Sequence, residues 1–241
     1  MPQIADSLIL ALILSTLAGL AIPLGGLLAR MEHIRPRWLE TELRHTVIAF
    51  GGGALLSAVA LVLVPEGTAH VAAPVAILLF ALGGLAFAWV DSQLDRKGGG
   101  GPQLVAMLLD FLPESLALGA LMASGSQTAW LLAGIIFLQN VPEGFNAYRE
   151  LIHKGRMAPG RVLMLFCALV LVGPASAAAG HIVLSDAPAV LGGIMLFAAG
   201  GILYLIFEDI APQAALRNRH APPLGAVAGF LLGLAGQLMT G

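Results

Sequence analysis

Eight apolar stretches, each close to the length of a membrane-spanning helix, dominate the 241-residue sequence. A helix needs about 20 mostly apolar residues to cross a bilayer, where it satisfies its own backbone hydrogen bonds. We therefore predict an all-α integral membrane protein with eight transmembrane helices in a single domain, residues 1–241. The predicted helices cover residues 5–29, 46–66, 72–90, 103–124, 127–148, 161–184, 188–211 and 221–240.

The composition supports this class of protein. Hydrophobic residues make up 58% of the chain and charged residues 11%, whereas soluble domains carry about 25% charged residues. This apolar composition makes the lipid bilayer the expected partner. The formal net charge of -2 argues against binding of nucleic acid. The single cysteine, Cys167, cannot form an internal disulfide or a thiolate zinc cluster, and its apolar surroundings predict a place in the core.

The basic residues predict how the chain is oriented. All 12 Lys and Arg residues fall in or beside alternate connections, and the other connections and both termini have none. Because cytoplasmic loops carry the excess of Lys and Arg, these connections are expected in the cytoplasm and both termini outside it. We predict a multi-pass protein of the cell membrane, meaning a plasma or inner membrane. The basic residues are Arg30, Arg35, Arg37, Arg44, Arg96, Lys97, Arg149, Lys154, Arg156, Arg161, Arg217 and Arg219.

Besides Asp6 and Glu66 at helix ends, five acidic residues lie within the predicted helices, and no Lys or Arg is placed inside a helix to pair with them. An ionisable group at membrane depth is costly, so each of the five is a functional candidate. Carboxylates that share a space of low dielectric constant must either take up protons or share a bound cation. The sequence therefore predicts a positively charged ligand. The five residues are Asp110, Glu114, Glu143, Glu208 and Asp209.

Two segments show how some of these acids combine. Asp110 and Glu114 are four residues apart, as are Gln139 and Glu143, so each pair lies on one face of its helix. A proline directly precedes each glutamate, and a proline inside a helix removes a backbone hydrogen bond and tends to kink the helix. We predict that residues 103–124 and 127–148 form two kinked, antiparallel central helices that hold a metal ion near the membrane midplane.

Other polar groups are candidates for a metal pathway. Glu208 and Asp209 lie near the end of the predicted helix 188–211, Glu66 ends the helix 46–66, and His181 is near the end of 161–184. Each can line a pathway or serve a structural role. A solvated helix end explains Glu66, and a satisfied interfacial side chain explains His181, so both readings stay open.

Three segments resemble the Zrt/Irt-like (ZIP) family of divalent metal transporters. The family's His-Asn-x-Pro-Glu-Gly pattern falls on residues 110–115, its His or Gln followed two residues later by Pro-Glu-Gly falls on 139–144, and its Tyr-rich run with a final His-Glu and a proline falls on 204–212. The resemblance implies eight helices with both termini outside and uptake of divalent metal ions toward the cytoplasm by alternating access. It also implies zinc as the substrate and a homodimer.

Three departures of the sequence from the family pattern bear on the metal ligands. Asp110 stands where the family has histidine, Phe111 where it has asparagine, and Gly173 where a glutamate is expected. These departures argue for one metal ion rather than two, with Asn140 as an accessory ligand. The remaining ligands would all be oxygen atoms, which suit harder cations such as manganese and select zinc less strongly than imidazole or thiolate. Manganese, iron and cadmium therefore stay open beside zinc.

Other classes of function remain as alternatives. A channel, a proton-coupled carrier of another substrate or a member of the family fold that has lost transport would use the same helices. An intramembrane metalloenzyme is disfavoured because the helices contain no HExxH or GxSxG motif. We expect no enzyme activity and no cofactor beyond the transported ion.

Overall fold

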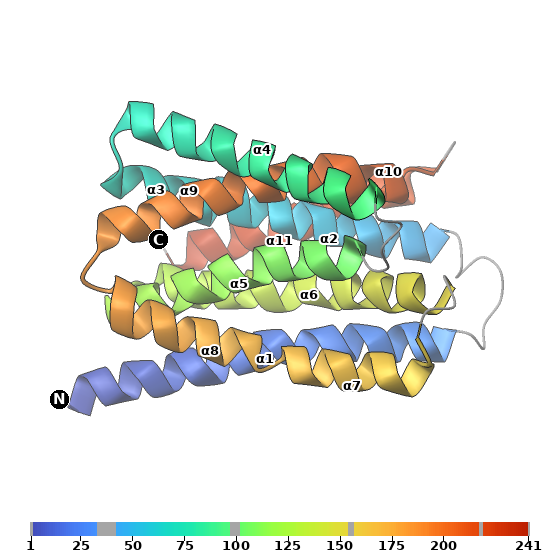
Figure 1. The fold of residues 1–241 in the computed structure, drawn as a ribbon, viewed down its shortest axis with the longest axis horizontal. Helices are drawn as coiled ribbons and strands as arrows, with labels where there is room; N and C mark the ends of the chain where they lie inside the picture. Colours follow the sequence, from blue (N-terminus) through green and yellow to red (C-terminus); the bar gives the residue numbers. More distant parts are fainter. Residues whose placement is uncertain (1, 33–41, 97–101, 154–156, 217–218, 241) are drawn as a thin grey trace.

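A computed structural model describes residues 2–32, 42–96, 102–153, 157–216 and 219–240, and these residues form an all-helical bundle (Figure 1). The long helices run roughly along one direction, so neighbours in the sequence are antiparallel. The elements are α1 (Pro2–Glu32), α2 (Arg44–Ala58), η2 (Val59–Leu63), α3 (Val64–His70), α4 (Ala73–Arg96), α5 (Pro102–Ala123), α6 (Thr128–His153), α7 (Pro159–Leu169), α8 (Val172–Ala179), η3 (Gly180–Leu184), α9 (Pro188–Leu205), η4 (Ile206–Ile210), α10 (Ala211–Ala214) and α11 (Ala221–Thr240).

Seven helical segments among the described residues are long and apolar enough to cross a membrane. Several of them join elements end to end; for example, α2, η2 and α3 form one span. Together with their exposed apolar side chains, these segments indicate a multi-pass membrane protein. The seven spans are Asp6–Met31, Arg44–His70, Ala73–Leu94, Gln103–Ala123, Pro159–Leu184, Pro188–Ala214 and Ala221–Met239.

The eighth predicted span corresponds to α6, which has 26 residues. It is long enough to cross a bilayer but is not among the seven apolar spans. Polar side chains such as Gln139, Asn140 and Glu143 interrupt its apolar sequence. The helix packs against α1, α2 and α5, so neighbouring helices cover much of it. The all-helical architecture is confirmed, and the crossing of the membrane by α6 stays a prediction.

Prolines have different effects in different parts of the bundle. Pro65 and Pro212 each follow a π-helical turn, η2 and η4. A proline cannot donate to the carbonyl four residues before it, which favours such local widening of the helix. Pro113 and Pro142, by contrast, lie inside α5 and α6, which remain α-helical across both positions. The kinks expected there remain a prediction.

The helices pack in two groups. In one, α1 packs along α6 and against α8, and α5 packs against α6 and α8. In the other, α2 packs along α11 and α4 along α9. The groups meet where α2 contacts α6 and α5 contacts α9. The two helices with the predicted metal ligands, α5 and α6, are therefore neighbours at the boundary between the groups.

Three consecutive glycines on α2 allow close contacts with three different neighbours. A Cβ atom at Gly51 would lie 2.6 Å from the ring of Pro142 on α6, and one at Gly52 would lie 2.8 Å from the side chain of Ile210. A Cβ at Gly53 would overlap the backbone of Ala226 on α11. Small residues let helices approach closely in membranes, and here they do so within a single chain.

Apolar side chains also cover much of the outer surface. Ile77, Leu85 and Met164 are each at least two-thirds exposed, as expected for side chains that face lipid. Cys167 on α7 is exposed as well, so the expectation of a core position was wrong. The physical reason is that lipid and protein core are both apolar, and an apolar neighbourhood in the sequence does not distinguish them.

The ends of the bundle differ in charge. Arg30 lies in the last turn of α1, Arg44 begins α2, and Arg161 is near the start of α7. These helix ends lie toward the right of Figure 1, which we call the basic end, whereas α1 begins and α11 ends toward the left. That the basic end faces the cytoplasm stays a prediction. Arg35, Arg37, Lys97, Lys154, Arg156 and Arg217 lie outside the described residues.

The contact between α1 and α6 gives a test of this packing. A Cβ atom at Gly144 would overlap the carbonyl of Ile22, whereas one at Gly134, also on α6, would meet no atom within 4 Å. We expect Gly144→Ala to lower the free energy of unfolding by about 1–3 kcal/mol. Gly134→Ala should change it little or raise it by up to about 1 kcal/mol, because alanine favours helix. Thermal unfolding in detergent measures both, and equal effects would contradict the packing.

Candidate metal site

The four predicted ligands of α5 and α6 come together in the structure. The Gln139 Nε2 atom donates a hydrogen bond of 2.5 Å to Glu114 Oε2. The carboxyl group of Asp110 lies beside that of Glu143. Two pairs of polar groups therefore connect the two helices, as the four-residue spacing on each helix predicts.

Several oxygen atoms in this cluster are buried without a hydrogen-bond donor from the protein. Glu114 and Gln139 are fully buried, and each leaves its Oε1 atom without a partner. Neither carboxyl oxygen of Glu143 makes a hydrogen bond, although Asp110 lies beside it. A buried acceptor without a partner costs about 1–3 kcal/mol. The cluster therefore offers oxygen atoms that a cation or a water molecule can satisfy.

The side-chain amide of Asn140 is held through its nitrogen, and its oxygen has no partner. Its Nδ2 atom donates a 3.0 Å hydrogen bond to the carbonyl of Ala18 on α1. Its Oδ1 atom is buried and has no partner. The contact with α1 orients the amide group, which leaves the oxygen available in the way an accessory ligand requires.

Two further buried polar residues of α5 and α6 were missed by sequence reasoning. Asn146 on α6 is 9% exposed, and its Oδ1 atom has no partner. Ser115, next to Glu114, is fully buried with its Oγ atom unpartnered. Asn146 follows Glu143 by three residues and Gln139 by seven, so extending the helical spacing by one turn could have found it. Ser115 gives no such signal.

The carboxyl groups do not converge on one point. Within the ranges that the structure describes, no three side chains of His, Cys, Asp or Glu are arranged to hold a metal ion. One reason is visible in the contacts, since Glu114 is paired with an amide rather than with Asp110 or Glu143. A cation that used the whole set would have to replace this hydrogen bond, and the ligand set stays a prediction.

A small cavity adjoins the cluster on the side of the basic end. Its volume is about 20 Å³, which is enough for one water molecule. Asp110 and Glu143 line it where it meets the cluster, and Asn146 and Asp209 line it further along. The remaining lining is mostly apolar and comes from α2, α5 and α9.

Asp209 has hydrogen-bond donors on both sides. Gln103 Nε2 donates to its Oδ2 atom, and Gln213 Nε2 donates to Oδ1 at 2.7 Å. The backbone N–H of Gln103 also donates to Glu150 Oε2 at 3.1 Å. These contacts join the starts and ends of three helices at the basic end of the cavity. The neighbouring Glu208 is exposed and does not line the cavity.

The other pathway candidates lie away from the cluster. Glu66 and His70 line a separate cavity of about 100 Å³ toward the end opposite the basic end, and none of the four predicted ligands lines it. His181 is buried and forms a 2.9 Å hydrogen bond with Ser7 of α1. It lines neither cavity, which favours a structural role.

Phe111 and Gly173, two of the departures from the family pattern, contact each other. The ring of Phe111 is fully buried. A Cβ atom would lie 2.8 Å from its Cζ atom at Gly173 and 3.3 Å from it at Gly19. The aromatic ring therefore occupies the space that the two glycines leave. This packing fits the prediction of a single ion, because an apolar ring stands where a second set of ligands would be needed.

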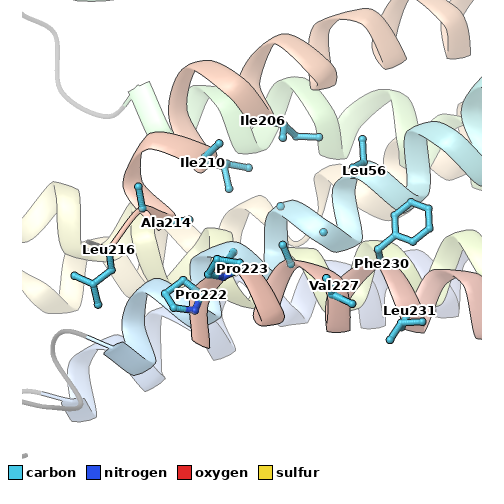
Figure 2. A pocket seen from close by; sticks show the side chains of 16 residues that line it. Leu56, Ile206, Ile210, Ala214, Leu216, Pro222, Pro223, Val227, Phe230 and Leu231 are labelled. Carbon is cyan, nitrogen blue, oxygen red and sulfur yellow. The ribbon is translucent and has the colours of Figure 1, made fainter. Parts of the chain in front are cut away.

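A much larger pocket lies elsewhere in the described structure. Figure 2 shows a pocket of about 950 Å³ between α2, α10 and α11, with the side chains of Leu56, Ile210 and Phe230 directed toward it. Its lining is almost entirely apolar, so it offers no ligands for a cation. Gly52 and Ile210 line this pocket and also the small cavity beside Asp110 and Glu143.

Comparison with known proteins gives one weak likeness. A search against models of protein families found no match. The chain is 24% identical over 142 residues to a protein of Caenorhabditis briggsae named zinc transporter zipt-7.1. The match covers 54% of this chain and 34% of the relative, so the chain spans about a third of the relative's length. The likeness agrees with the resemblance that the motifs of α5, α6 and α9 suggest.

The fit of Phe111 can be tested by its removal. We expect Phe111→Ala to lower the free energy of unfolding by about 3 kcal/mol or more, because truncation leaves a void between two glycines that cannot fill it. Phe137 on α6 is 37% exposed, so Phe137→Ala is the matched control and should lower the free energy of unfolding much less. Thermal unfolding of both variants in detergent decides, and a small effect of Phe111→Ala would contradict the tight fit.

Proposed function

We propose that the protein is a transporter of divalent cations, which carries zinc or a similar ion such as manganese, iron or cadmium. The observation that supports this most directly is the set of buried, unpartnered oxygen atoms on Glu114, Gln139, Asn140 and Glu143. These oxygens lie within a bundle of apolar, membrane-length helices. A purely structural bundle has no need for such a group, because each buried acceptor without a partner lowers stability.

A divalent cation explains the oxygens better than water alone. Ionised carboxylates only accept hydrogen bonds, and Asp110, Glu114 and Glu143 would repel one another in a space of low dielectric constant. A bound cation supplies the positive charge and can coordinate several oxygens at once. In the proposed bound state, Gln139 releases Glu114, both turn their oxygens to the ion together with Asp110 and Glu143, and Asn140 adds its amide oxygen.

The identity of the ion is proposed from two sources. The relative in Caenorhabditis briggsae is named a zinc transporter, and zinc binds carboxylate oxygens. The proposed ligands include no imidazole or thiolate, which would favour zinc over harder ions. We therefore expect zinc to be carried and manganese and iron to compete with it.

We propose transport toward the cytoplasm, the direction that the family resemblance implies, with the small cavity as the route on that side. The cavity leads from Asp110 and Glu143 toward Asp209 at the basic end. If that end faces the cytoplasm, as the basic residues predict, an ion that leaves by this route enters the cell. Uptake by alternating access would then expose the site in turn to this cavity and to the one that Glu66 and His70 line.

Uptake into proteoliposomes tests the proposal. We expect saturable uptake of zinc, and of manganese, iron or cadmium when offered singly, by the unmodified protein. Glu143→Ala should lower uptake at least tenfold because it removes a carboxylate ligand. Glu208→Ala is the matched control and should transport normally, because Glu208 is exposed and outside the cavity.

Two results would contradict the proposal. Normal uptake by a folded Glu143→Ala protein would remove the site of α5 and α6 from the pathway. Absence of uptake of every ion by the folded, inserted protein would reject transport of divalent cations. A current that rises with concentration without saturation would instead identify a channel.

The proposed ligands also predict a dependence on pH. Carboxyl groups must lose their protons to coordinate a metal, so protons compete with the ion. Metal affinity of the purified protein should therefore fall as the pH is lowered from 7.5 toward 5, and it should recover when the pH is restored. Affinity that stays constant over this range would contradict coordination by carboxylates.

A further inference from the structure

We propose that Asn146 is a further cation ligand, which forms with Asp110 and Glu143 a second coordination position beside the first. This inference rests on the proposed function, because it gives the transported ion a second place to bind. It concerns a residue outside the motifs that resemble the ZIP family. Asn146 lies about one helical turn closer to the basic end than Glu143 and about two turns closer than Gln139.

The burial of Asn146 is the first observation behind this inference. The side chain is 9% exposed, yet its Oδ1 atom has no hydrogen-bond partner in the protein. A buried polar atom without a partner is costly, and a leucine of similar size would avoid this cost. The position therefore carries an amide where packing alone favours an apolar residue.

The surroundings of Asn146 indicate what its oxygen can bind. It shares the cavity of about 20 Å³ with the carboxyl groups of Asp110, Glu143 and Asp209. Ionised carboxylates cannot donate to the Oδ1 atom, and the side chains of Met107 and Ile202, also in the lining, have no polar hydrogen. The amide group of Gln103, the remaining polar group of the lining, donates to Asp209 and not to Asn146. A cation can be coordinated by the amide oxygen and the carboxylates together.

The spacing along α6 places this position in line with the first one. Gln139, Glu143 and Asn146 occur at intervals of four and three residues, which puts all three on one face of the helix. An ion bound near Gln139 and Glu114 could move to Asn146 while Asp110 and Glu143 stay coordinated. The ion would then never lose all of its ligands at once, which lowers the cost of moving it through an apolar bundle.

Equilibrium metal binding to the purified full-length chain tests the role of Asn146. We expect Asn146→Leu to weaken binding of zinc or manganese about tenfold, because loss of even an outer-shell partner of a metal ion typically costs about 10–100-fold in affinity. Asn146→Asp keeps an oxygen ligand and should bind within about threefold of the unmodified protein or more tightly. Equal, unchanged affinity in both variants would overturn the proposal.

A spectroscopic test shows whether an atom at position 146 touches the ion. The exposed Cys167 is first replaced by serine, and Asn146→Cys is then introduced. Cadmium binds thiolate strongly, so adding cadmium should produce the ultraviolet absorption band of a thiolate–cadmium bond. The band should vanish when Glu143→Ala is added. Ala147→Cys is the matched control, because Ala147 is fully buried on the same helix but does not line the cavity.

The results separate this inference from the proposed function. Uptake that depends on Glu143, together with unchanged metal affinity in Asn146→Leu and no band in Asn146→Cys, would overturn the second position and leave transport intact. A band that depends on Glu143, with weaker binding in Asn146→Leu but no uptake of any ion by the unmodified protein, would support the second position and reject transport. A band in Ala147→Cys as strong as in Asn146→Cys would also overturn the second position.

Discussion

The need to shield the polar face of α6 from lipid governs much of this structure. Carboxylate and amide groups are costly in hydrocarbon, and α6 carries four of them in just over two turns. The helix is covered by α1, α2 and α5, and it can be covered closely because glycines stand at the contacts. Gly25 and Gly144 bring α1 and α6 together, and Gly51 accepts the ring of Pro142. The glycines therefore allow the close helix packing that keeps the polar groups of α6 away from lipid.

The same enclosure gives the polar groups their chemical character. A water-filled surface would satisfy each oxygen separately, whereas the packed interior leaves Glu114, Gln139 and Glu143 with acceptor atoms that no protein donor reaches. The contact between Gln139 and Glu114 shows how the cluster is held without a shared ligand. Its members pair off, and no point is surrounded by three acids in the described residues. We infer that a cation would change the pairing, so that binding and a change of conformation are linked.

Much of the fold could be predicted from the sequence because its strongest signal, the length of each apolar stretch, is set by the thickness of a bilayer. The four-residue spacing on α5 and α6 likewise predicts that Asp110, Glu114 and Glu143 are presented together. Other features depend on packing that no local pattern records. Cys167 lies in an apolar stretch but on the outer surface. Asn146 is a candidate ligand only because residues of α2 and α9 complete the cavity that it lines.

The close packing of Phe111 against Gly173 limits which residues each position can hold. A glutamate at position 173 could not be accommodated here, because its Cβ atom would lie 2.7 Å from the carbonyl oxygen of Ser15 and 2.8 Å from the ring of Phe111. An aromatic residue at position 111 likewise needs glycine on the helices it faces. The two positions therefore constrain each other, and a single substitution at either one would leave a void or an overlap. This side of the cluster is therefore filled by a closely packed aromatic ring, whereas Asn146 on the other side has a buried oxygen atom without a partner.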